Sequence, residues 1–269
     1  MKSEFYLQAY VDYLELSNKA SKTIEIYTPI VYSFLKMCGD DPLKVSKQDI
    51  IKFILSKEGT RTRQQCKGAL KHLFEGVLQK PGYLKFVPNP KREQYIPNIL
   101  SQDEAKKVLS NISNKKHHAI LNLQYYAALR TGEVISLKVN DIRKDGIVHI
   151  RQSKGAKDRL VPVSEEILNT LRNYYKEYSP KHFLFEGQDK ISKYSSKSIQ
   201  AIVKKYCLLN GVKRKIRPHD LRHSRATHLH ENGVGIKFIQ DLLGHKKVST
   251  TEIYLHTNVQ SLKKAILNC

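Results

Sequence analysis

Apolar residues at helical spacing dominate the first third of the chain. Within residues 5–79 they recur every three or four positions, as in the run from Ile24 to Leu35, and Pro42 and Gly59 interrupt the pattern. This spacing places apolar side chains along one face of a helix, where they can pack against neighbouring helices. The pattern predicts a compact bundle of about four helices.

A proline-rich segment follows the predicted bundle. Residues 80–98 contain four prolines among basic and polar residues, a composition that is typical of linkers. We therefore expect a helical domain over residues 1–88, a linker over residues 89–98 and a second domain over residues 99–269.

The second domain begins with a helix-start signal. The Ser101 hydroxyl can accept a hydrogen bond from the third helical N–H while Glu104 reaches back, and this capping box predicts a helix over residues 102–109. The next helix is expected to stop at Gly132 in a left-handed turn, so that Arg130 lies at a junction between helices. Further helices are expected over residues 116–129, 165–178, 198–210, 218–231 and 235–243.

Two short runs in the second domain have β-strand character. Residues 146–151 and 159–163 flank a basic turn, which predicts a β-hairpin with Lys154 at its tip. A second capping box, over residues 249–252, places Tyr254 in the first turns of a short helix. The predicted fold class is therefore mainly α with a small β-hairpin (α+β).

The charge balance indicates a polyanionic partner. Lys and Arg number 47 against 25 Asp and Glu, a formal net charge of +22, which exceeds what solubility requires. A merely basic, well-solvated surface is the alternative. Binding to nucleic acid explains so large an excess better.

The sequence favours a cytoplasmic protein outside the membrane, associated with the nucleoid if the host is bacterial. No apolar run approaches the roughly 18 residues needed to cross a bilayer, and the N-terminus lacks the pattern of a signal peptide. The cysteines have neither metal-ligand nor redox spacing and are expected to be reduced thiols. They are Cys38, Cys66, Cys207 and Cys269.

Two pairs of residues in the second domain could carry chemistry. On the helix expected over residues 218–231, His219 and Arg222 project from one face and offer a proton-transfer group beside a fixed cation. A basic helix paired with surface carboxylates is the alternative. Near the start of a short helix, Glu133 could orient Arg130 through a charge-assisted hydrogen bond, and an ordinary surface ion pair is the alternative there.

Three further candidates are weak when each is taken singly. Lys154 could be a solvated turn residue or a nonspecific phosphate contact. His245 follows a predicted helix end, where a histidine commonly caps the helix. A lone tyrosine such as Tyr254 more often fills a core or a surface.

Taken together, the order and spacing of these residues resemble the tyrosine recombinase (phage integrase) family. The matching motifs are Leu-Arg130-Thr-Gly-Glu133, Ser-Lys154-Gly, His219-x-x-Arg222-His223, Leu-Gly-His245 and Ser-Thr-Thr-Glu-Ile-Tyr254. In length and layout the chain is similar to Xer-like recombinases and to small integrases of phages and other mobile elements. The resemblance implies an N-terminal helical, SAM-like core-binding domain, a recombinase catalytic domain and an active enzyme.

The set of residues motivates a hypothesis of DNA integration or recombination by strand cleavage and rejoining. Tyr254 attacks the scissile phosphate and keeps the bond energy in a phosphotyrosine intermediate, and the resemblance makes this linkage 3′ with a free 5′-hydroxyl. Arg130 and Arg222 clamp the non-bridging oxygens, because planar guanidinium forks match phosphate oxygens.

The remaining candidates complete the hypothesis as proton donors, acceptors and supports. His219 accepts the tyrosine proton, His245 donates to a phosphate oxygen, and Lys154 protonates the leaving 5′-oxygen. Glu133 and His223 are expected to support the site. No metal ion or other cofactor is implied, because these cations and acids cover the roles that a metal would fill.

One helix of the first domain carries the expected DNA contacts. Its basic residues recur on one broad side, opposite a row of apolar residues, so that the two domains could close around duplex DNA. The basic residues are Arg61, Arg63, Lys67 and Lys71.

The partners implied by the resemblance are double-stranded DNA and further copies of the chain. A tail helix is expected from about residue 257, with apolar residues at helical spacing. The resemblance favours exchange of this tail between subunits of a tetramer on two DNA sites, and packing onto its own domain is the alternative. The need for an accessory DNA-bending protein is left open.

Two other functions fit the same residues. A type IB topoisomerase uses the same strand-cleaving chemistry, and a noncatalytic DNA-binding regulator would use the same scaffold without forming an adduct. The helical first domain, the proline-rich linker and the apolar tail favour recombination. The target sequence, and the choice among integration, excision, dimer resolution and inversion, depend on docking geometry that one chain does not encode.

Overall fold

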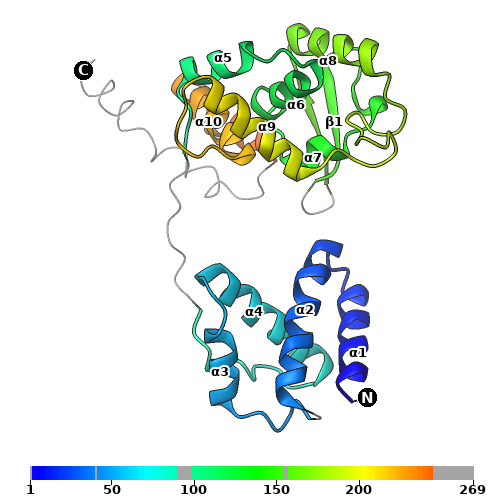
Figure 1. The fold of residues 1–269 in the computed structure, drawn as a ribbon, viewed down its shortest axis with the longest axis vertical. Coiled ribbons are helices and arrows are strands. Elements are labelled where there is room, and N and C mark those ends of the chain that lie inside the picture. The colour runs from blue at the N-terminus through cyan, green and yellow to red at the C-terminus, as the bar shows by residue number, and fades with distance from the viewer. Residues whose placement is uncertain (1, 40, 90–97, 154–156, 245–269) are drawn as a thin grey trace, which may run out of the picture. The chain divides into compact units, whose positions relative to one another are not determined.

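The computed structural model describes residues 2–39, 41–89, 98–153 and 157–244 (Figure 1). The chain divides into two compact units, residues 1–94 and 95–269, and each is described by itself. Most of the predicted linker lies outside the described residues, so the domain limits at residues 88 and 99 stay predictions. Among the described residues no helix is long and apolar enough to cross a membrane.

The described part of the first unit consists of four α-helices and a π-helical turn, as the apolar spacing predicted. Helix α2 contacts α1 and α4, and α4 contacts α3. Their apolar faces meet in one core that includes Tyr10, Phe34 and Phe74. The elements are α1 (Lys2–Leu16), α2 (Ser21–Cys38), α3 (Lys47–Leu55), α4 (Thr60–His72) and η1 (Leu73–Val77).

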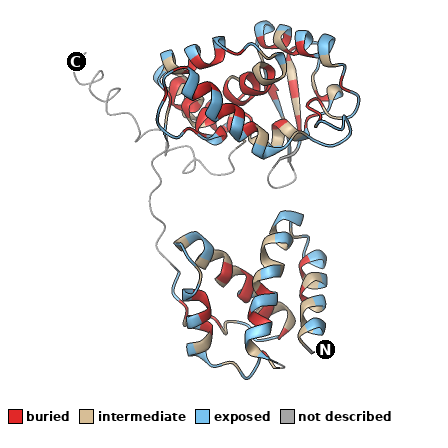
Figure 2. Ribbon diagram, viewed as in Figure 1, coloured by how far each residue is buried: buried red, intermediate tan, exposed pale blue. Residues whose placement is uncertain are grey.

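The second unit is arranged around one buried helix. Helix α6 (Lys115–Tyr125) is buried continuously from Ala119 onward, and Figure 2 shows it in red among more exposed helices. A helix that is buried on all sides must be covered by several neighbours. Those in contact with α6 are α5 (Gln102–Ser110), α7 (Thr131–Ser136), α8 (Glu165–Tyr178), α9 (Ser196–Leu209) and α10 (Pro218–Glu231).

A two-stranded antiparallel sheet packs beside these helices. Strand β1 (Ile147–Ser153) pairs with β2 (Lys157–Pro162). Val148 and Val161 face each other in the register, and both are buried. The predicted fold class, mainly helical with a small β-hairpin, is confirmed. The remaining described elements are the 3-10 helix η2 (Val139–Asp141) and α11 (Ile236–Leu243).

The predicted helix end near residue 129 and the predicted stop at Gly132 are both wrong. Helix α6 ends at Tyr125 and not near residue 129, and the left-handed residue after it is Ala128, with a φ of 49°. Gly132 is not a stop, because it lies inside α7, which Arg130 precedes as N-cap residue. The apolar pattern continues past the end of α6 because the turn itself is buried. Buried turn residues are apolar as well, so the helical spacing of apolar residues overestimates the length of the helix.

Candidate active site

Arg130 and Glu133 meet at the start of α7. The carboxylate accepts a hydrogen bond from the backbone N–H of Arg130 at 2.8 Å and another from its Nη1 at 2.7 Å. The Glu133 side chain is only 8% exposed, so this is no ordinary surface ion pair. Glu133 therefore holds both the backbone and the guanidinium of Arg130.

The first turns of α10 carry the other described candidates. The helix begins with a proline, which suits a position where no N–H is needed, and Asp220 accepts a hydrogen bond from the backbone N–H of Arg217 at 2.8 Å. His219 is exposed, and its ring lies 4.7 Å from that of His223 in an edge-to-face arrangement. Arg222 is fully buried and donates to the Ala128 carbonyl at 2.6 Å.

Three arginines from separate segments converge on the C-terminus of α11. The last carbonyl groups of a helix have no partner within it, and the helix dipole makes this end favourable for cations. Here three consecutive carbonyl oxygens accept hydrogen bonds from guanidinium groups. The pairs are Arg159 with Leu242, Arg222 with Leu243 and Arg130 with Gly244.

The same three arginines surround Glu133. Arg159 forms a two-pronged pair with it, at 2.7 Å from Nη1 to Oε1 and 2.8 Å from Nη2 to Oε2. Nη1 of Arg222 lies 3.8 Å from Oε2 of Glu133. Burial raises the pKa of the carboxyl, but the hydrogen bonds and charge of Arg159 and the hydrogen bonds of Arg130 outweigh it and lower the pKa to about 2. One permanent negative charge therefore faces three positive ones.

Gly244 occupies the left-handed position after α11, with a φ of 60°. A Cβ at this position would lie 3.0 Å from Cδ of Arg159. Glycine is thus favoured for two reasons: the backbone conformation and the close packing of the Arg159 side chain. This gives a physical reason for the glycine of the Leu-Gly-His motif.

The electrostatic setting of His219 favours a neutral ring. Although the residue as a whole is exposed, desolvation of its ring lowers its pKa, and the positive charges of Arg222 and Arg130 lower it further against the opposing influence of Asp220 and Glu133. An imidazole whose pKa lies below the ordinary range is unprotonated at neutral pH and can accept a proton.

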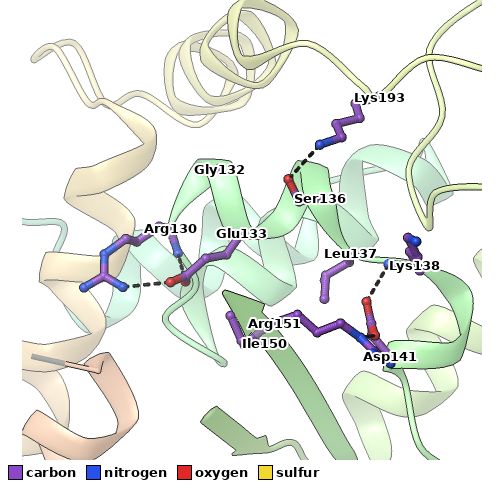
Figure 3. A pocket seen from close by; sticks show the side chains of 10 residues that line it. All are labelled: Arg130, Gly132, Glu133, Ser136, Leu137, Lys138, Asp141, Ile150, Arg151 and Lys193. Atoms are coloured by element: carbon purple, nitrogen blue, oxygen red, sulfur yellow. Dashed lines mark hydrogen bonds and ion pairs between the residues drawn. The ribbon is translucent and has the colours of Figure 1, made fainter. Parts of the chain in front are cut away.

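A pocket of about 580 Å³ adjoins Arg130. Figure 3 shows Arg130 and Glu133 at one end of it and Arg151 with Asp141 toward the other, where Nε of Arg151 donates to Asp141 at 2.6 Å. Four basic and two acidic residues line the pocket, and this excess of positive charge suits an anionic strand. The basic lining residues are Arg130, Lys138, Arg151 and Lys193.

The two candidate phosphate ligands differ in accessibility. The side chain of Arg130 is 24% exposed at the edge of this pocket, whereas that of Arg222 has no exposed surface. A direct contact between Arg222 and a phosphate therefore requires a rearrangement of its surroundings.

Three predicted catalytic residues, Lys154, His245 and Tyr254, lie outside the described residues. The structure brings Arg130, Glu133 and Arg222 together and leaves the catalytic roles as predictions. Within the described part of the chain no group of three or more His, Cys, Asp or Glu side chains could hold a metal ion.

Arg159 is the residue of this site that the sequence reasoning missed. It lies on β2 opposite Ile150 and two residues before Val161, both of which are buried. Alternation along a strand therefore places Arg159 on the inward face. A charged residue at an inward strand position was the available signal.

The four basic residues predicted to bind DNA all lie on α4 but have different surroundings. Arg61 and Lys71 are exposed. Arg63 is half-buried and donates from Nε to the Lys57 carbonyl at 2.9 Å, and Lys67 donates to Asn89 at 2.7 Å. The second pair thus also serves the structure of the first unit, and the DNA contacts stay predictions.

Comparisons with known sequences found close similarity along the chain. The Phage integrase family matches residues 98–261. Tyrosine recombinase XerA of Pyrococcus horikoshii is 36% identical over 272 residues, which cover 97% of this chain and 92% of that protein. A tyrosine recombinase of Pseudothermotoga lettingae is 33% identical, with 98% and 97% covered.

Comparisons with solved structures agree. The crystal structure of XerA recombinase covers 99% of this chain and 98% of its own, with a TM-score of 0.60 and 28% identity. A lambda integrase dimer bound to a COC′ core site has a TM-score of 0.76 at 19% identity, with 96% of each chain covered. The second likeness, at so low an identity, concerns the fold alone.

Proposed function

The chain belongs to the phage integrase family, and from this premise we propose that it cleaves and rejoins double-stranded DNA at specific sites through a 3′-phosphotyrosine on Tyr254. The observation that carries the proposal is the convergence of Arg130 and Arg222 with Glu133, while His219 precedes Arg222 by one helical turn. These residues come from the start of α7 and from α10, which are distant in sequence, and they follow the order of the family's motifs.

In the proposed reaction the Tyr254 oxygen attacks phosphorus and the bond to the 5′-oxygen breaks. Negative charge builds on the non-bridging oxygens, and Arg130 and Arg222 stabilise it, because guanidinium groups stay charged at any working pH. The lowered pKa of His219 suits it to accept the tyrosine proton. The energy of the broken bond is kept in the phosphotyrosine, so that rejoining needs no further energy source.

Three further roles are proposed, two of them for Lys154 and His245, which lie beyond the described part of the chain. Lys154 protonates the leaving 5′-oxygen, and His245 donates to a phosphate oxygen. His223 supports the turn that carries His219, since their rings are in contact.

The direct test is formation of an SDS-resistant protein–DNA adduct on nicked duplexes tiled over the DNA that flanks this gene. The wild type is expected to form the adduct, and Tyr254→Phe is expected to form none, because it lacks the nucleophile. Tyr175→Phe is the matched control, since Tyr175 is an exposed tyrosine, and it should behave as the wild type. Specific binding without an adduct would instead favour a noncatalytic regulator.

A second test separates recombination from topoisomerase activity. A recombinase exchanges strands between two sites, whereas a type IB topoisomerase relaxes supercoiled plasmid without exchange. Recombined product from a plasmid that carries two copies of the reactive site is the expected result. Relaxation alone would favour the topoisomerase.

We further propose that the protein works as a tetramer on two DNA sites, joined by exchange of the tail after Tyr254. Deletion of the residues from 257 onward should abolish cooperative assembly on DNA and leave the binding of a single subunit. Intact cooperativity in a mobility-shift titration would argue against this role of the tail.

A further inference from the structure

We propose that Arg159 is a positioning residue for strand cleavage, which holds Glu133 in place and takes up part of its negative charge, and thereby leaves the Arg130 guanidinium available to phosphate. This inference rests on the function proposed above. It concerns a side chain that acts through another and does not itself touch DNA.

Arg159 makes more side-chain hydrogen bonds to the Glu133 carboxylate than Arg130 does. Its two terminal nitrogens bind both carboxylate oxygens at 2.7 and 2.8 Å, whereas the side chain of Arg130 binds only Oε1, at 2.7 Å. A two-pronged pair is both stronger and more specific in direction than a single hydrogen bond. The side chains of Arg159 and Glu133 are 11% and 8% exposed, so solvent screens the pair little.

The charges explain why this sharing affects phosphate binding. With Arg159 present, three guanidinium groups face one carboxylate. Without it, the charge of Glu133 would fall on Arg130 and on the more distant Arg222 alone. Arg130 would then be held more firmly by the carboxylate, and the site would attract an anionic phosphate less.

Arg159 also joins segments that lead to proposed catalytic residues. Arg159 follows Lys154 by five residues in the sequence, and its Nε donates to the carbonyl of Leu242 at 3.2 Å, three residues before His245. The same side chain packs against Gly244. One guanidinium therefore connects β2, α7 and the end of α11.

The test is a double-mutant cycle on the full-length protein. Single-turnover adduct formation is measured at saturating concentration of a nicked duplex that reacts with the wild type. Arg159→Leu should lower the rate about 100-fold, the size expected for losing one well-placed cation. In the Glu133→Gln background the same change should cost less than about threefold, because a neutral amide no longer draws on Arg130.

Two further variants keep the result interpretable. Arg159→Lys retains the positive charge but cannot form the two-pronged pair, and its rate of adduct formation should fall about 10-fold, again only when Glu133 is present. This variant provides the test if Arg159→Leu does not fold. Arg172→Leu is the control, since Arg172 forms an exposed pair with Glu165 on α8, and it should react as the wild type. Thermal unfolding of each protein reports its stability separately.

The outcomes separate this inference from the function on which it rests. A wild-type protein that forms no adduct would overturn the proposed function. A reactive wild type with an Arg159→Leu variant within twofold of it would overturn the role of Arg159 alone. An equal loss in both backgrounds would also overturn it, because the effect would then come from packing against the end of α11.

Discussion

The interiors of the two units are built from different side chains. Among the described residues, the core of the first unit is apolar, and every buried polar or charged side chain lies in the second unit. These are Asn122, Gln124, Asp141, Glu186, Asn210, Asp220, Arg222, Ser224, Thr227, His228 and Gln240. Burying a polar group costs free energy unless it is hydrogen-bonded. The core of the second unit thus depends on hydrogen bonds to its buried polar groups, whereas the described core of the first unit depends mainly on apolar packing.

The contrast extends to the contacts within each core. In the first unit the buried Tyr10 hydroxyl donates to the Ala69 carbonyl at 3.0 Å, and edge-to-face packing joins Phe34 to Phe53. In the second unit the buried contacts include Arg222 with a backbone carbonyl. Apolar packing tolerates substitution of similar volume, whereas a buried charge requires its partners.

The largest expected effect comes from replacing Arg222. In Arg222→Leu the Ala128 and Leu243 carbonyls lose their donor and the charge cluster loses a cation. Adduct formation should fall about 1000-fold, and the free energy of unfolding should fall by about 3–5 kcal/mol. Single-turnover cleavage and denaturant titration measure the two effects.

The matched change in the first unit is Leu70→Ala, at a fully buried apolar position. It should lower the free energy of unfolding by about 2–5 kcal/mol with cleavage within a few-fold of the wild type below the unfolding transition. Equal losses of cleavage in both variants would break the comparison, because stability alone would then explain the effect.

The same contrast decides what the sequence could predict. The limits of α8 and α10 follow from local signals, such as the proline that begins α10, and both match the expected ranges. The left-handed Ala128 was missed because buried residues continue the helical pattern past α6. Strand alternation marks Arg159 as facing inward, but it does not identify its partner Glu133, which lies 26 residues away and meets it only across the fold.

Acid should affect the second unit first. Four of its histidines have lowered pKa values, with burial as the largest cause, against His72 alone in the described part of the first unit. The unfolded state therefore binds more protons below pH 6.5, and stability present above that pH is lost as the pH falls. Glu133, with a pKa of about 2, keeps its contribution until the pH falls below 4.5. The four histidines are His117, His118, His219 and His228.

Hydrogen exchange followed by mass spectrometry on the full chain can test this, because it reports peptides of each unit separately. Protection in the second unit should decrease more between pH 7 and pH 5, after correction for the intrinsic exchange rate. Parallel losses in both units would show that these four histidines do not control acid stability.

A smaller effect is expected on the surface of the first unit. The double variant Arg61→Gln/Lys71→Gln removes the two exposed charges of the predicted DNA-binding helix. If both contact phosphates, the slope of log K against log salt should become shallower by about 1.8, or 0.9 for each contact. Lys22→Gln is the control, since Lys22 is an exposed lysine on α2, outside the predicted DNA-binding helix. An unchanged slope in the double variant would remove Arg61 and Lys71 from the DNA interface.

The smallest effect distinguishes the end of α11 from an ordinary left-handed turn. Gly233 and Gly244 both have positive φ, 81° and 60°, so alanine costs about 1 kcal/mol of backbone strain at either position. A Cβ at Gly233 meets nothing within 4 Å, whereas at Gly244 it lies 3.0 Å from Arg159. Gly244→Ala should therefore lose about 1 kcal/mol more and slow cleavage several-fold, while Gly233→Ala loses stability alone. Thermal unfolding measures the loss of stability, and single-turnover cleavage measures the rate. If the two variants behave identically, the Arg159 side chain can move away from the new methyl group without cost and is not held in place by its ion pairs.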